Sequence, residues 1–193
     1  MHRIRIGVLR GGPSNEYNIS LQTGATVLAN LSREKYDIKD ILIDKAGIWH
    51  FGGIPRLPHD ILSNLDVAFN ALHGHYGEDG KIQHILETHS IPFTGSNSFS
   101  SAIGMNKFMS KEVFKKNKMK TPHSILLDSL VDLSKNVHEV FKKFPLPIVV
   151  KPTSGGSSVG VELVHDYAYL EECVKKALER SRSVLLEEYI KGK

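Results

Sequence analysis

The chain has 193 residues, of which 40% are hydrophobic, and 25 basic against 21 acidic residues give a formal charge of +4 and a pI near 9.1. This length accommodates one or two domains, and the hydrophobic share is typical of soluble globular proteins. No apolar run approaches the roughly 18 residues that span a membrane. The single cysteine, Cys173, excludes an internal disulfide framework, so we expect a cytoplasmic protein.

The first half of the chain alternates short apolar runs with helical periodicity. Strands that alternate with helices indicate an open parallel sheet, so we expect an α/β domain over residues 1–96. The expected strands span residues 3–9, 37–44, 48–51, 66–72 and 91–94. The expected helices carry Leu21, Ala25, Leu28 and Leu31 on one apolar face, and Ile82, Ile85 and Leu86 on another that Asp79 caps.

Two polar loops, residues 11–16 and 73–79, follow the first and third main strands of this sheet. In open α/β sheets, ligands bind beyond the carboxyl ends of the strands, where both loops are expected. Glu16 stands at the start of a helix, where its carboxylate either offsets the helix dipole or accepts a ligand's ammonium group. His73 is either a turn residue on the sheet edge or a site residue, and the sequence leaves both alternatives open.

The second half, residues 97–193, is predicted to be an antiparallel sheet with helices, an α+β arrangement. The expected strands span residues 123–127, 148–150, 159–164 and 183–190. One expected helix carries Phe108, Val113 and Phe114; the next carries Leu130, Leu133, Val137, Val140 and Phe141; the last carries Leu170, Val174, Ala177 and Leu178 and is capped by Asp166.

A lysine-rich stretch covers residues 107–120. It is either a nucleic-acid patch or the solvated face of a helix. No aromatic-interleaved strand or reading helix accompanies it, so we favour the solvated face and expect no nucleic-acid partner. Its lysines are Lys107, Lys111, Lys115, Lys116, Lys118 and Lys120.

A glycine-rich turn between two expected strands has the sequence Lys-Pro-Thr-Ser-Gly-Gly-Ser-Ser-Val-Gly, residues 151–160. Gly155 and Gly156 can adopt backbone geometries that point successive N–H groups at one anion. Hydroxyl groups and the Lys151 ammonium add further donors, so a triphosphate is the expected guest. The lysine precedes the glycines and a strand follows them, which excludes a P-loop and a dinucleotide fingerprint. A plain flexible hairpin is the alternative.

Four motifs together resemble the D-alanine–D-alanine ligases of the ATP-grasp superfamily over essentially the whole chain. They are Gly-Gly-Pro-Ser-Asn-Glu at 11–16 with Ile19-Ser20, Ala-Leu-His-Gly at 71–74 with Gly-Glu-Asp-Gly at 77–80, Met-Asn-Lys at 105–107, and Val-Lys-Pro at 150–152 with Gly-Ser-Ser-Val-Gly at 156–160. The resemblance implies a pre-ATP-grasp domain followed by the first α+β subdomain of an ATP-grasp fold. Three positions depart from the family pattern: Asn106 for Asp, Gly155 for Glu, and Glu188 for a Lys found in some members.

The resemblance also implies roles for individual residues. It places Glu16 beside the first D-alanine, in one hydrogen-bond network with Ser157, and His73 near the reacting carboxylate. Glu16 and Ser157 are the implied catalytic residues. The implied ATP-binding residues are Lys107, Lys151, Ser154, Gly155, Gly156, Ser157, Ser158, Glu187, Glu188 and Ile190.

The implied reaction uses ATP and Mg²⁺ to convert one D-alanine carboxylate into an acyl phosphate. The amine of a second D-alanine then attacks, which yields the dipeptide of peptidoglycan precursors. A homodimer formed through the N-terminal domain is also implied. A D-alanine–D-lactate or D-alanine–D-serine ligase, and a non-catalytic nucleotide-binding module, are the alternatives.

The family continues well past the position of Lys193, so we expect an N-terminal portion that does not turn over alone. The magnesium ligands would then lie beyond residue 193, and none is assigned within this chain. We also expect the last strand, residues 183–190, to lose sheet neighbours and present an exposed edge.

Overall fold

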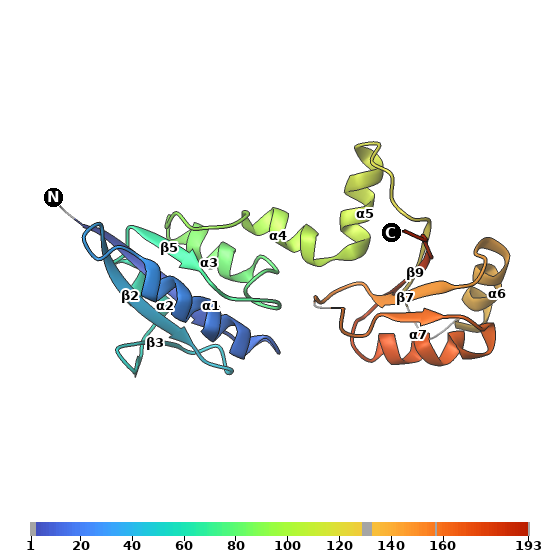
Figure 1. The fold of residues 1–193 in the computed structure, drawn as a ribbon, viewed down its shortest axis with the longest axis horizontal. Coiled ribbons are helices and arrows are strands. Elements are labelled where there is room, and N and C mark those ends of the chain that lie inside the picture. Colours follow the sequence, from blue (N-terminus) through green and yellow to red (C-terminus); the bar gives the residue numbers. More distant parts are fainter. Residues whose placement is uncertain (1–2, 129–132, 157, 193) are drawn as a thin grey trace. The chain divides into compact units, whose positions relative to one another are not determined.

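The computed structural model describes residues 3–128, 133–156 and 158–192, without the side chains of residues 133–137. It divides into two compact units, Met1–Ile103 and Gly104–Lys193, which are coloured blue to green and green to red in Figure 1. The domain boundary expected after residue 96 stays a prediction. Within the described ranges, no helix has the length and apolar character needed to cross a lipid bilayer.

Unit 1 contains a five-stranded sheet in the order β4-β3-β2-β1-β5. The central strand β1 (Ile4–Gly11) is parallel to β2 (Tyr36–Ile43) and β5 (Val67–Asn70), as expected. At one edge, β3 (Trp49–Phe51) and the unforeseen β4 (Ile54–Pro55) add antiparallel strands. The strand expected at residues 91–94 is reduced to one bridge between Phe93 and Ala68, because Pro92 lacks the N–H that would extend the ladder.

Helices cover both faces of this sheet. The helices α2 (Pro58–Leu62) and α3 (Lys81–Thr88) enclose the main core on one face, which includes Leu9, Ile41, Ile43, Leu62, Ile82 and Leu86. Ile82 and Leu86 are fully buried as expected, and Asp79 accepts a hydrogen bond from the backbone N–H of Lys81 (3.1 Å). The short α2 was not foreseen.

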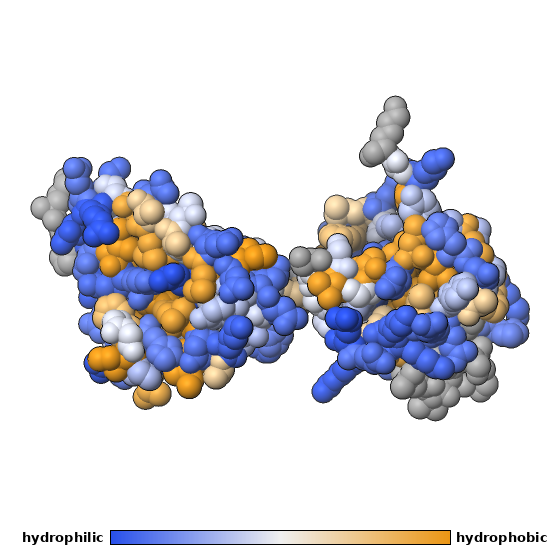
Figure 2. All heavy atoms as spheres, turned by 60° about the horizontal axis from the view of Figure 1, so that its bottom comes forward, coloured by the Kyte–Doolittle hydropathy of each residue, from blue (hydrophilic) through white to orange (hydrophobic). Residues whose placement is uncertain are grey.

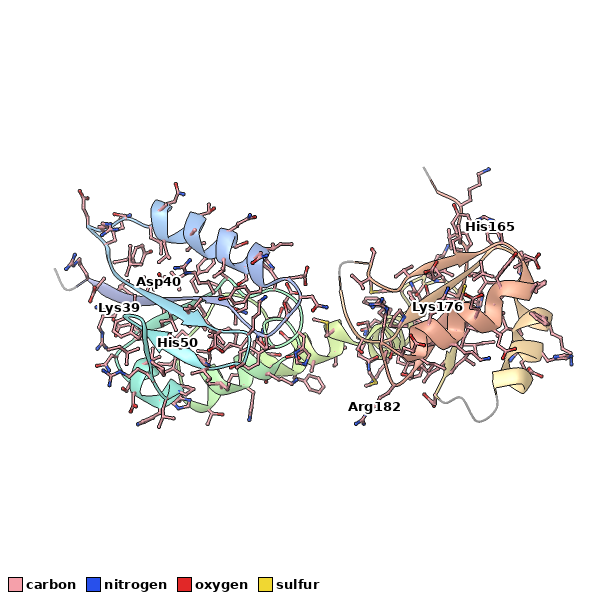
Figure 3. The ribbon with its side chains drawn as sticks, turned by 90° about the horizontal axis from the view of Figure 1, so that it is seen from below. Lys39, Asp40, His50, His165, Lys176 and Arg182 are labelled. Carbon is pink, nitrogen blue, oxygen red and sulfur yellow. The ribbon has the colours of Figure 1, made fainter. Side chains whose placement is uncertain are left out.

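The helix α1 (Tyr17–Asn30) packs on the other face through small residues, not through the apolar stripe expected from the sequence. Its buried residues are Ser20 and Gly24, whereas Ala25 is exposed. An added Cβ on Gly24 would lie 2.6 Å from Cβ of Arg10 on β1, so the helix and the strand approach too closely for a larger side chain. Arg10 in turn forms an ion pair with Asp40 of β2 (2.6 Å). Asp40 is labelled in Figure 3.

Unit 2 contains a four-stranded antiparallel sheet in the order β6-β9-β7-β8, which confirms the expected α+β arrangement. Its strands are β6 (Ser124–Leu127), β7 (Ile148–Pro152), β8 (Glu162–Val164) and β9 (Val184–Glu188). The expectation of an exposed edge at the last strand was wrong, because β9 is central and pairs with both β6 and β7. The sheet edges are β6 and β8.

Two helices, α6 (Leu133–Lys143) and α7 (Leu170–Leu178), pack on the core of this sheet. Leu170, Val174 and Ala177 are buried as expected, and the expected Asp166 cap forms on the 3₁₀ helix η2 (Tyr167–Tyr169), which leads into α7. Val140 of α6 is also buried. The expected helix residue Leu130 and the side chains of Leu133 and Val137 lie outside the described part of the chain.

The helices α4 (Ser98–Met105) and α5 (Lys107–Lys116) connect the parts of the chain that form the two sheets. The side chain of Asn106 caps α5 by accepting a hydrogen bond from the backbone N–H of Met109 (3.1 Å). The predicted outward lysine face was wrong for Lys111, which is 5% exposed, while Val113 and Phe114 are 38% and 40% exposed. Figure 2 shows orange, hydrophobic side chains on the visible surface of each unit.

Candidate functional site

Glu187 and Lys151 lie on the same face of the unit 2 sheet. The β7–β9 register pairs Glu187 with Val149 and Lys151 with Leu185, so Glu187 and Lys151 are diagonal neighbours. Side chains alternate along strands, which places Val150 and Leu186 on the opposite face, in the core beneath α6 and α7. The central strands thus pack an apolar face against α6 and α7, and their other face carries Glu187 and Lys151 beside the fully buried Leu185.

Glu187 is only 5% exposed, and its carboxylate binds two ammonium groups. Its Oε2 pairs with Nζ of Lys151, and its Oε1 lies 2.7 Å from Nζ of Lys111. A buried carboxylate needs such partners, because burial without them would cost several kcal/mol, roughly 3–5. The two oxygens therefore fix both lysines at one point on the sheet.

Lys107 joins this group from the start of α5. Its backbone N–H donates to the carbonyl of Thr153 (2.8 Å), and its Nζ donates to the carbonyl of Gly155 (2.8 Å). Burial, and then the positive charge of Lys151, lower the pKa of Lys107, while the Glu187 carboxylate opposes the shift. The two lysines singled out in the sequence are thus brought into one ionic cluster, which we call the lysine cluster: Lys107, Lys111, Lys151 and Glu187.

The lysine cluster carries three ammonium groups against one carboxylate, an excess of two positive charges. The excess lies next to the glycine-rich loop, because Lys107 is bonded to that loop through Gly155. Concentrated positive charge of low exposure favours a polyanion such as a polyphosphate. Lys111 was missed as a site residue, although its spacing of four from Lys107 places both on one helix face.

The glycine-rich loop requires glycine at two positions. Gly155 and Gly160 have φ values of +101° and +78°, and Ser158 also adopts a left-handed conformation, with φ of +57°. These turns interrupt the extended backbone, so β8 begins at Glu162 rather than at the expected residue 159. A Cβ on Gly155 or Gly156 would meet no atom within 4 Å, which leaves this stretch open to an incoming group.

Hydroxyl groups attach the start of this loop to the segment before β9. Thr153 Oγ1 lies 2.8 Å from Ser183 Oγ, and Ser154 Oγ lies 3.0 Å from Ser181 Oγ. A backbone bridge also joins Ser154 to Asn106. Ser157, expected in the site from its sequence, lies outside the described residues.

The remaining residues of the expected adenine hinge lie apart from the lysine cluster. Glu188 Oε1 accepts a hydrogen bond from the backbone N–H of His123 (2.8 Å), which fastens β9 to the start of β6. Ile190 follows the strand and is 60% exposed. Within the described part of the chain, neither side chain makes a hydrogen bond or ion pair with the three lysines.

In unit 1, Ser14 links the two polar loops that carry Glu16 and His73. Its hydroxyl donates to the carbonyl of His73 (2.7 Å) and accepts from the backbone N–H of Glu16 (2.9 Å). The Glu16 side chain makes no capping hydrogen bond to α1 and instead lies over Gly74, where an added Cβ would be 2.5 Å from its Oε2. Glu16 and His73 are therefore held close together at the carboxyl ends of β1 and β5.

The His73 ring is oriented by contacts at both nitrogens. Its Nε2 lies 2.9 Å from Thr23 Oγ1 on α1, and its Nδ1 lies 3.4 Å from Glu78 Oε1. His73 and Glu78 line a cavity of about 340 Å³ together with Asn70 and Thr94. Polar groups at this end of the sheet therefore face open space, as expected for the ligand end of an open α/β sheet.

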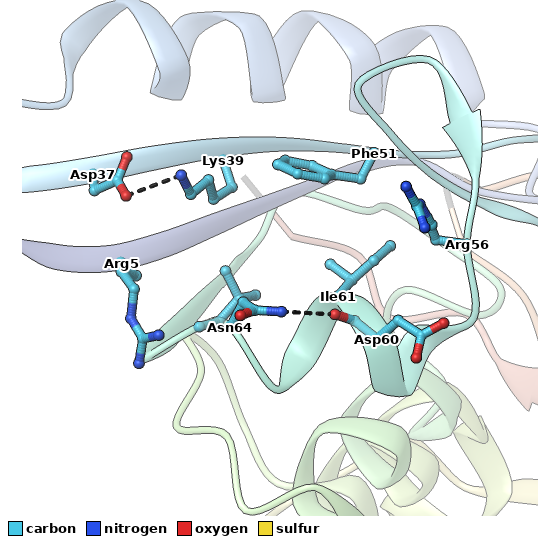
Figure 4. Close-up of a pocket in the computed structure, with 9 residues that line it drawn as sticks. Arg5, Asp37, Lys39, Phe51, Arg56, Asp60, Ile61 and Asn64 are labelled. Atoms are coloured by element: carbon cyan, nitrogen blue, oxygen red, sulfur yellow. Dashed lines mark hydrogen bonds and ion pairs between the residues drawn. The ribbon is translucent and has the colours of Figure 1, made fainter.

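A second cavity of unit 1, of about 420 Å³, contains neither Glu16 nor His73. Figure 4 shows its lining of charged and apolar side chains, which includes Arg5, Phe51 and Arg56, and the ion pair between Lys39 and Asp37 (2.9 Å). Arg5 stands near the amino end of β1, so this cavity opens away from the strand ends where ligands bind in such sheets. We do not assign it to the candidate site.

Family models match most of the chain. The model described as D-ala D-ala ligase N-terminus matches residues 5–56 and 54–96, and the model described as D-ala D-ala ligase C-terminus matches residues 125–193. Among curated relatives, a D-alanine–D-alanine ligase of Bacillus anthracis is 40% identical over 98% of this chain and 58% of its own length. One of Clostridium beijerinckii is 38% identical over 98% of this chain and 59% of its own length.

Solved structures of D-alanine ligases also resemble this chain. The VanG D-Ala:D-Ser ligase of Enterococcus faecalis superposes with a TM-score of 0.90 at 28% identity, over 99% of this chain and 64% of that one. The Bacillus anthracis D-alanine–D-alanine ligase complexed with ATP superposes with a TM-score of 0.77 at 35% identity, over 98% of this chain and 60% of that one. The chain spans 58–59% of the length of the two curated relatives described above.

Proposed function

This chain belongs to the D-alanine–D-alanine ligase family, and we propose that it serves the ATP-dependent joining of two D-alanines for peptidoglycan precursor synthesis. The lysine cluster carries this proposal. Its two excess positive charges lie beside an open glycine-rich loop, an arrangement suited to the phosphates of ATP. The Bacillus anthracis relative whose structure was solved with ATP supports the choice of nucleotide.

In the proposed reaction, a carboxylate oxygen of the first D-alanine attacks the γ-phosphorus of ATP, and ADP leaves. The amine of the second D-alanine then attacks the acyl carbon, loses a proton and releases phosphate. Lys107 and Lys151 bind and neutralise the phosphates, and the loop with Ser154, Gly155, Gly156, Ser157 and Ser158 covers them. The chain needs no covalent nucleophile, because positioning and charge neutralisation lower the barrier of phosphoryl transfer.

Unit 1 supplies the proposed amino-acid site. The Glu16 carboxylate, held over Gly74, accepts the ammonium of the first D-alanine, and His73 orients its carboxylate. Glu187, Glu188 and Ile190 lie by the adenine. The family resemblance supports these roles, a homodimer formed through the N-terminal domain, and a cytoplasmic setting.

Magnesium would accompany ATP and offset its phosphate charge. Within the described ranges, no group of three or more His, Cys, Asp or Glu side chains is placed to hold a metal ion. These residues do not fit a complete magnesium site, so we assign no step of the reaction to a metal ligand of this chain.

D-Alanine–D-serine ligation is the second candidate function. The superposition with the VanG D-Ala:D-Ser ligase, with its TM-score of 0.90, favours it. The curated relatives at 38% and 40% identity bear the name D-alanine–D-alanine ligase, and we therefore place D-alanine first. Competition between D-alanine and D-serine for the second position in the full-length enzyme distinguishes the two.

Nucleotide binding by the 193-residue chain tests the proposal directly. We expect Lys107→Met and Lys151→Met each to weaken ATP binding about tenfold or more, because each removes a charged hydrogen-bond donor to phosphate. Lys116→Met, which removes an exposed charge from the same helix, is the matched control. Isothermal titration calorimetry provides the measurement, and ATP affinities equal to that of the control would refute the role of the cluster.

Turnover is a separate question from binding. We expect that this chain is inactive alone. A coupled assay that detects ADP release by the 193-residue chain in the presence of D-alanine tests this expectation. Sustained ADP release above a D-alanine-free control would contradict that expectation.

A further inference from the structure

Lys111 is a buried lysine whose hydrogen-bonding capacity is fully used. Its Nζ lies 2.7 Å from Glu187 Oε1, 2.8 Å from Thr121 Oγ1 and 2.7 Å from the carbonyl oxygen of Pro122. An ammonium group has three N–H donors, and here three acceptors receive them. The side chain is 6% exposed, so Lys111 has neither a free donor nor access to a ligand.

Lys107 and Lys151 differ from Lys111 in this respect. Nζ of Lys107 donates to one described acceptor, the Gly155 carbonyl, and Nζ of Lys151 pairs with one, the Glu187 carboxylate. Each of these ammonium groups therefore retains donors for another partner. The side chain of Lys151 is 23% exposed, compared with 6% for Lys111.

Glu187 connects the two kinds of lysine, because its two oxygens bind Lys111 and Lys151 separately. Lys111 balances the negative charge of Glu187, and the remaining charge of the cluster is then the two ammonium groups of Lys107 and Lys151. Without Lys111, the Glu187 carboxylate would be balanced by Lys151, and the excess charge would fall from two to one. The carboxylate would also lose the contact that fixes its orientation.

We propose that Lys111 is a positioning residue of the phosphate site, which holds and neutralises Glu187 so that Lys151 keeps its charge and place for the phosphates. This inference rests on the proposed function. It assigns a role to a residue that touches no phosphate itself, and it explains why a lysine occupies a buried position of α5.

Binding of tripolyphosphate to the 193-residue chain tests the inference, because this probe has phosphates but no adenine. We expect Lys111→Met to weaken binding about tenfold, the effect of roughly one unit charge in a partly buried site. Lys116→Met removes the same charge from an exposed position of α5 and should change binding less than about twofold, since surface charges are screened. Far-UV circular dichroism and thermal unfolding establish that each variant is folded.

The double variant Lys111→Met/Glu187→Gln distinguishes two roles of Lys111, the neutralisation of Glu187 and a purely structural contribution. If Lys111 acts by neutralising Glu187, removing the carboxylate as well should recover at least about threefold of the lost affinity, as coupled sites do not add. Should Lys111→Met fail to fold, Lys111→Gln replaces it, with the same loss and the same recovery expected.

The outcomes are distinct. If Lys111→Met binds tripolyphosphate like Lys116→Met, or if the double variant stays as weak as the single one, the inference is overturned while the proposed function stands. If the wild-type chain binds neither tripolyphosphate nor ATP, the proposed function fails, and the inference fails with it.

Discussion

Gly74 lies directly beneath the carboxylate of Glu16. Its φ of +69° is in the left-handed region, and an added Cβ would come within 2.5 Å of Glu16 Oε2 and 3.3 Å of Ser14 Oγ. The position therefore requires glycine for two reasons, its backbone conformation and the close approach of a charged side chain. The placement of Glu16 depends on a residue that carries no functional group.

A pair of glycine substitutions separates these two requirements. Gly47 has a similar φ of +83° but no atom within 4 Å of an added Cβ. We expect Gly47→Ala to cost about 1 kcal/mol from backbone strain alone, and Gly74→Ala about 2–3 kcal/mol, because the steric clash adds to it. Urea unfolding followed by the fluorescence of Trp49, the only tryptophan of the chain, measures both. Equal losses would show that the contact with Glu16 is easily relieved.

At the residue scale, the roles that the sequence assigns to site residues stay predictions, whereas the exposure expected for Lys111 was wrong. The sequence singled out Lys107 and Lys151, and the structure places them in one cluster. Lys111 was assigned to a solvated face, because its acceptors, Thr121, Pro122 and Glu187, come from segments outside the helix. The spacing of four from Lys107 is a local signal for a shared helix face, but it does not indicate burial against Glu187, which is remote in the sequence.

The unit 2 sheet has two faces that differ in chemistry. Leu186 of β9 is fully buried beneath the helices α6 and α7, whereas Leu163 of β8 is 43% exposed. The position of the strand determines this difference, because β9 is a central strand and β8 is an edge strand. Leu185 of β9 shares the face of Leu163 and is nevertheless fully buried. The face beneath α6 and α7 holds the core of the unit, and the other face carries the lysine cluster, with Lys111 contributed by α5.

Truncation of these two leucines measures how unequal the central and the edge position are. We expect Leu186→Ala to cost about 2–5 kcal/mol through lost burial and the cavity left behind. Leu163→Ala should cost less than about 1 kcal/mol, because it removes little buried surface. Guanidinium unfolding followed by far-UV circular dichroism compares the variants. A loss at Leu163 as large as that at Leu186 would mean that this edge position is packed in solution.

Elements with several periodic residues were predicted well, and short elements were not. Alternation or helical periodicity located β1, β2, β9 and α7 to within a few residues. The two-residue β4 exists only through its pairing with β3, and α1 packs through Ser20 and Gly24 because close approach to β1 outweighs its apolar stripe. Such features depend on tertiary contacts that a local pattern does not contain.

At the scale of the whole chain, each unit has its own hydrophobic core. Leu9, Ile41 and Trp49 belong to the core of unit 1, whereas Val150 and Leu186 belong to that of unit 2. Trp49 is 2% exposed and therefore reports the unfolding of unit 1. Stability is expected to be a property of each unit rather than of the chain as one body.

Two core substitutions test this expectation. Val150→Ala should destabilise unit 2 by about 2 kcal/mol and leave the Trp49 fluorescence transition unchanged, because the lost contacts lie in the other core. Ile41→Val, the control within unit 1, should cost about 1 kcal/mol and shift that transition. The measurement is denaturant unfolding read in parallel by fluorescence and far-UV circular dichroism. A shift of the fluorescence midpoint by Val150→Ala would show that the units unfold together.

The α/β followed by α+β organisation could be predicted from the sequence, because alternating strands and helices in the first half give way to consecutive strands in the second. The central position of β9 in the unit 2 sheet could not be predicted from the sequence. Strand order depends on which strands pair across long separations, and β6 and β9 are joined by residues more than fifty positions apart. Sequence patterns specify which segments are strands but not which neighbours they meet.

The Ser14 hydroxyl, which contacts the backbone of both ligand-end loops of unit 1, has a consequence for engineering. Both of its partners are main-chain groups, the carbonyl of His73 and the N–H of Glu16, which a residue of any type supplies. The link between the segments therefore depends on a hydroxyl at position 14 and not on the side chains of the other segment. Chimeras that keep Ser14 should retain the native arrangement of Glu16 and His73, whereas chimeras that lose this hydroxyl should not.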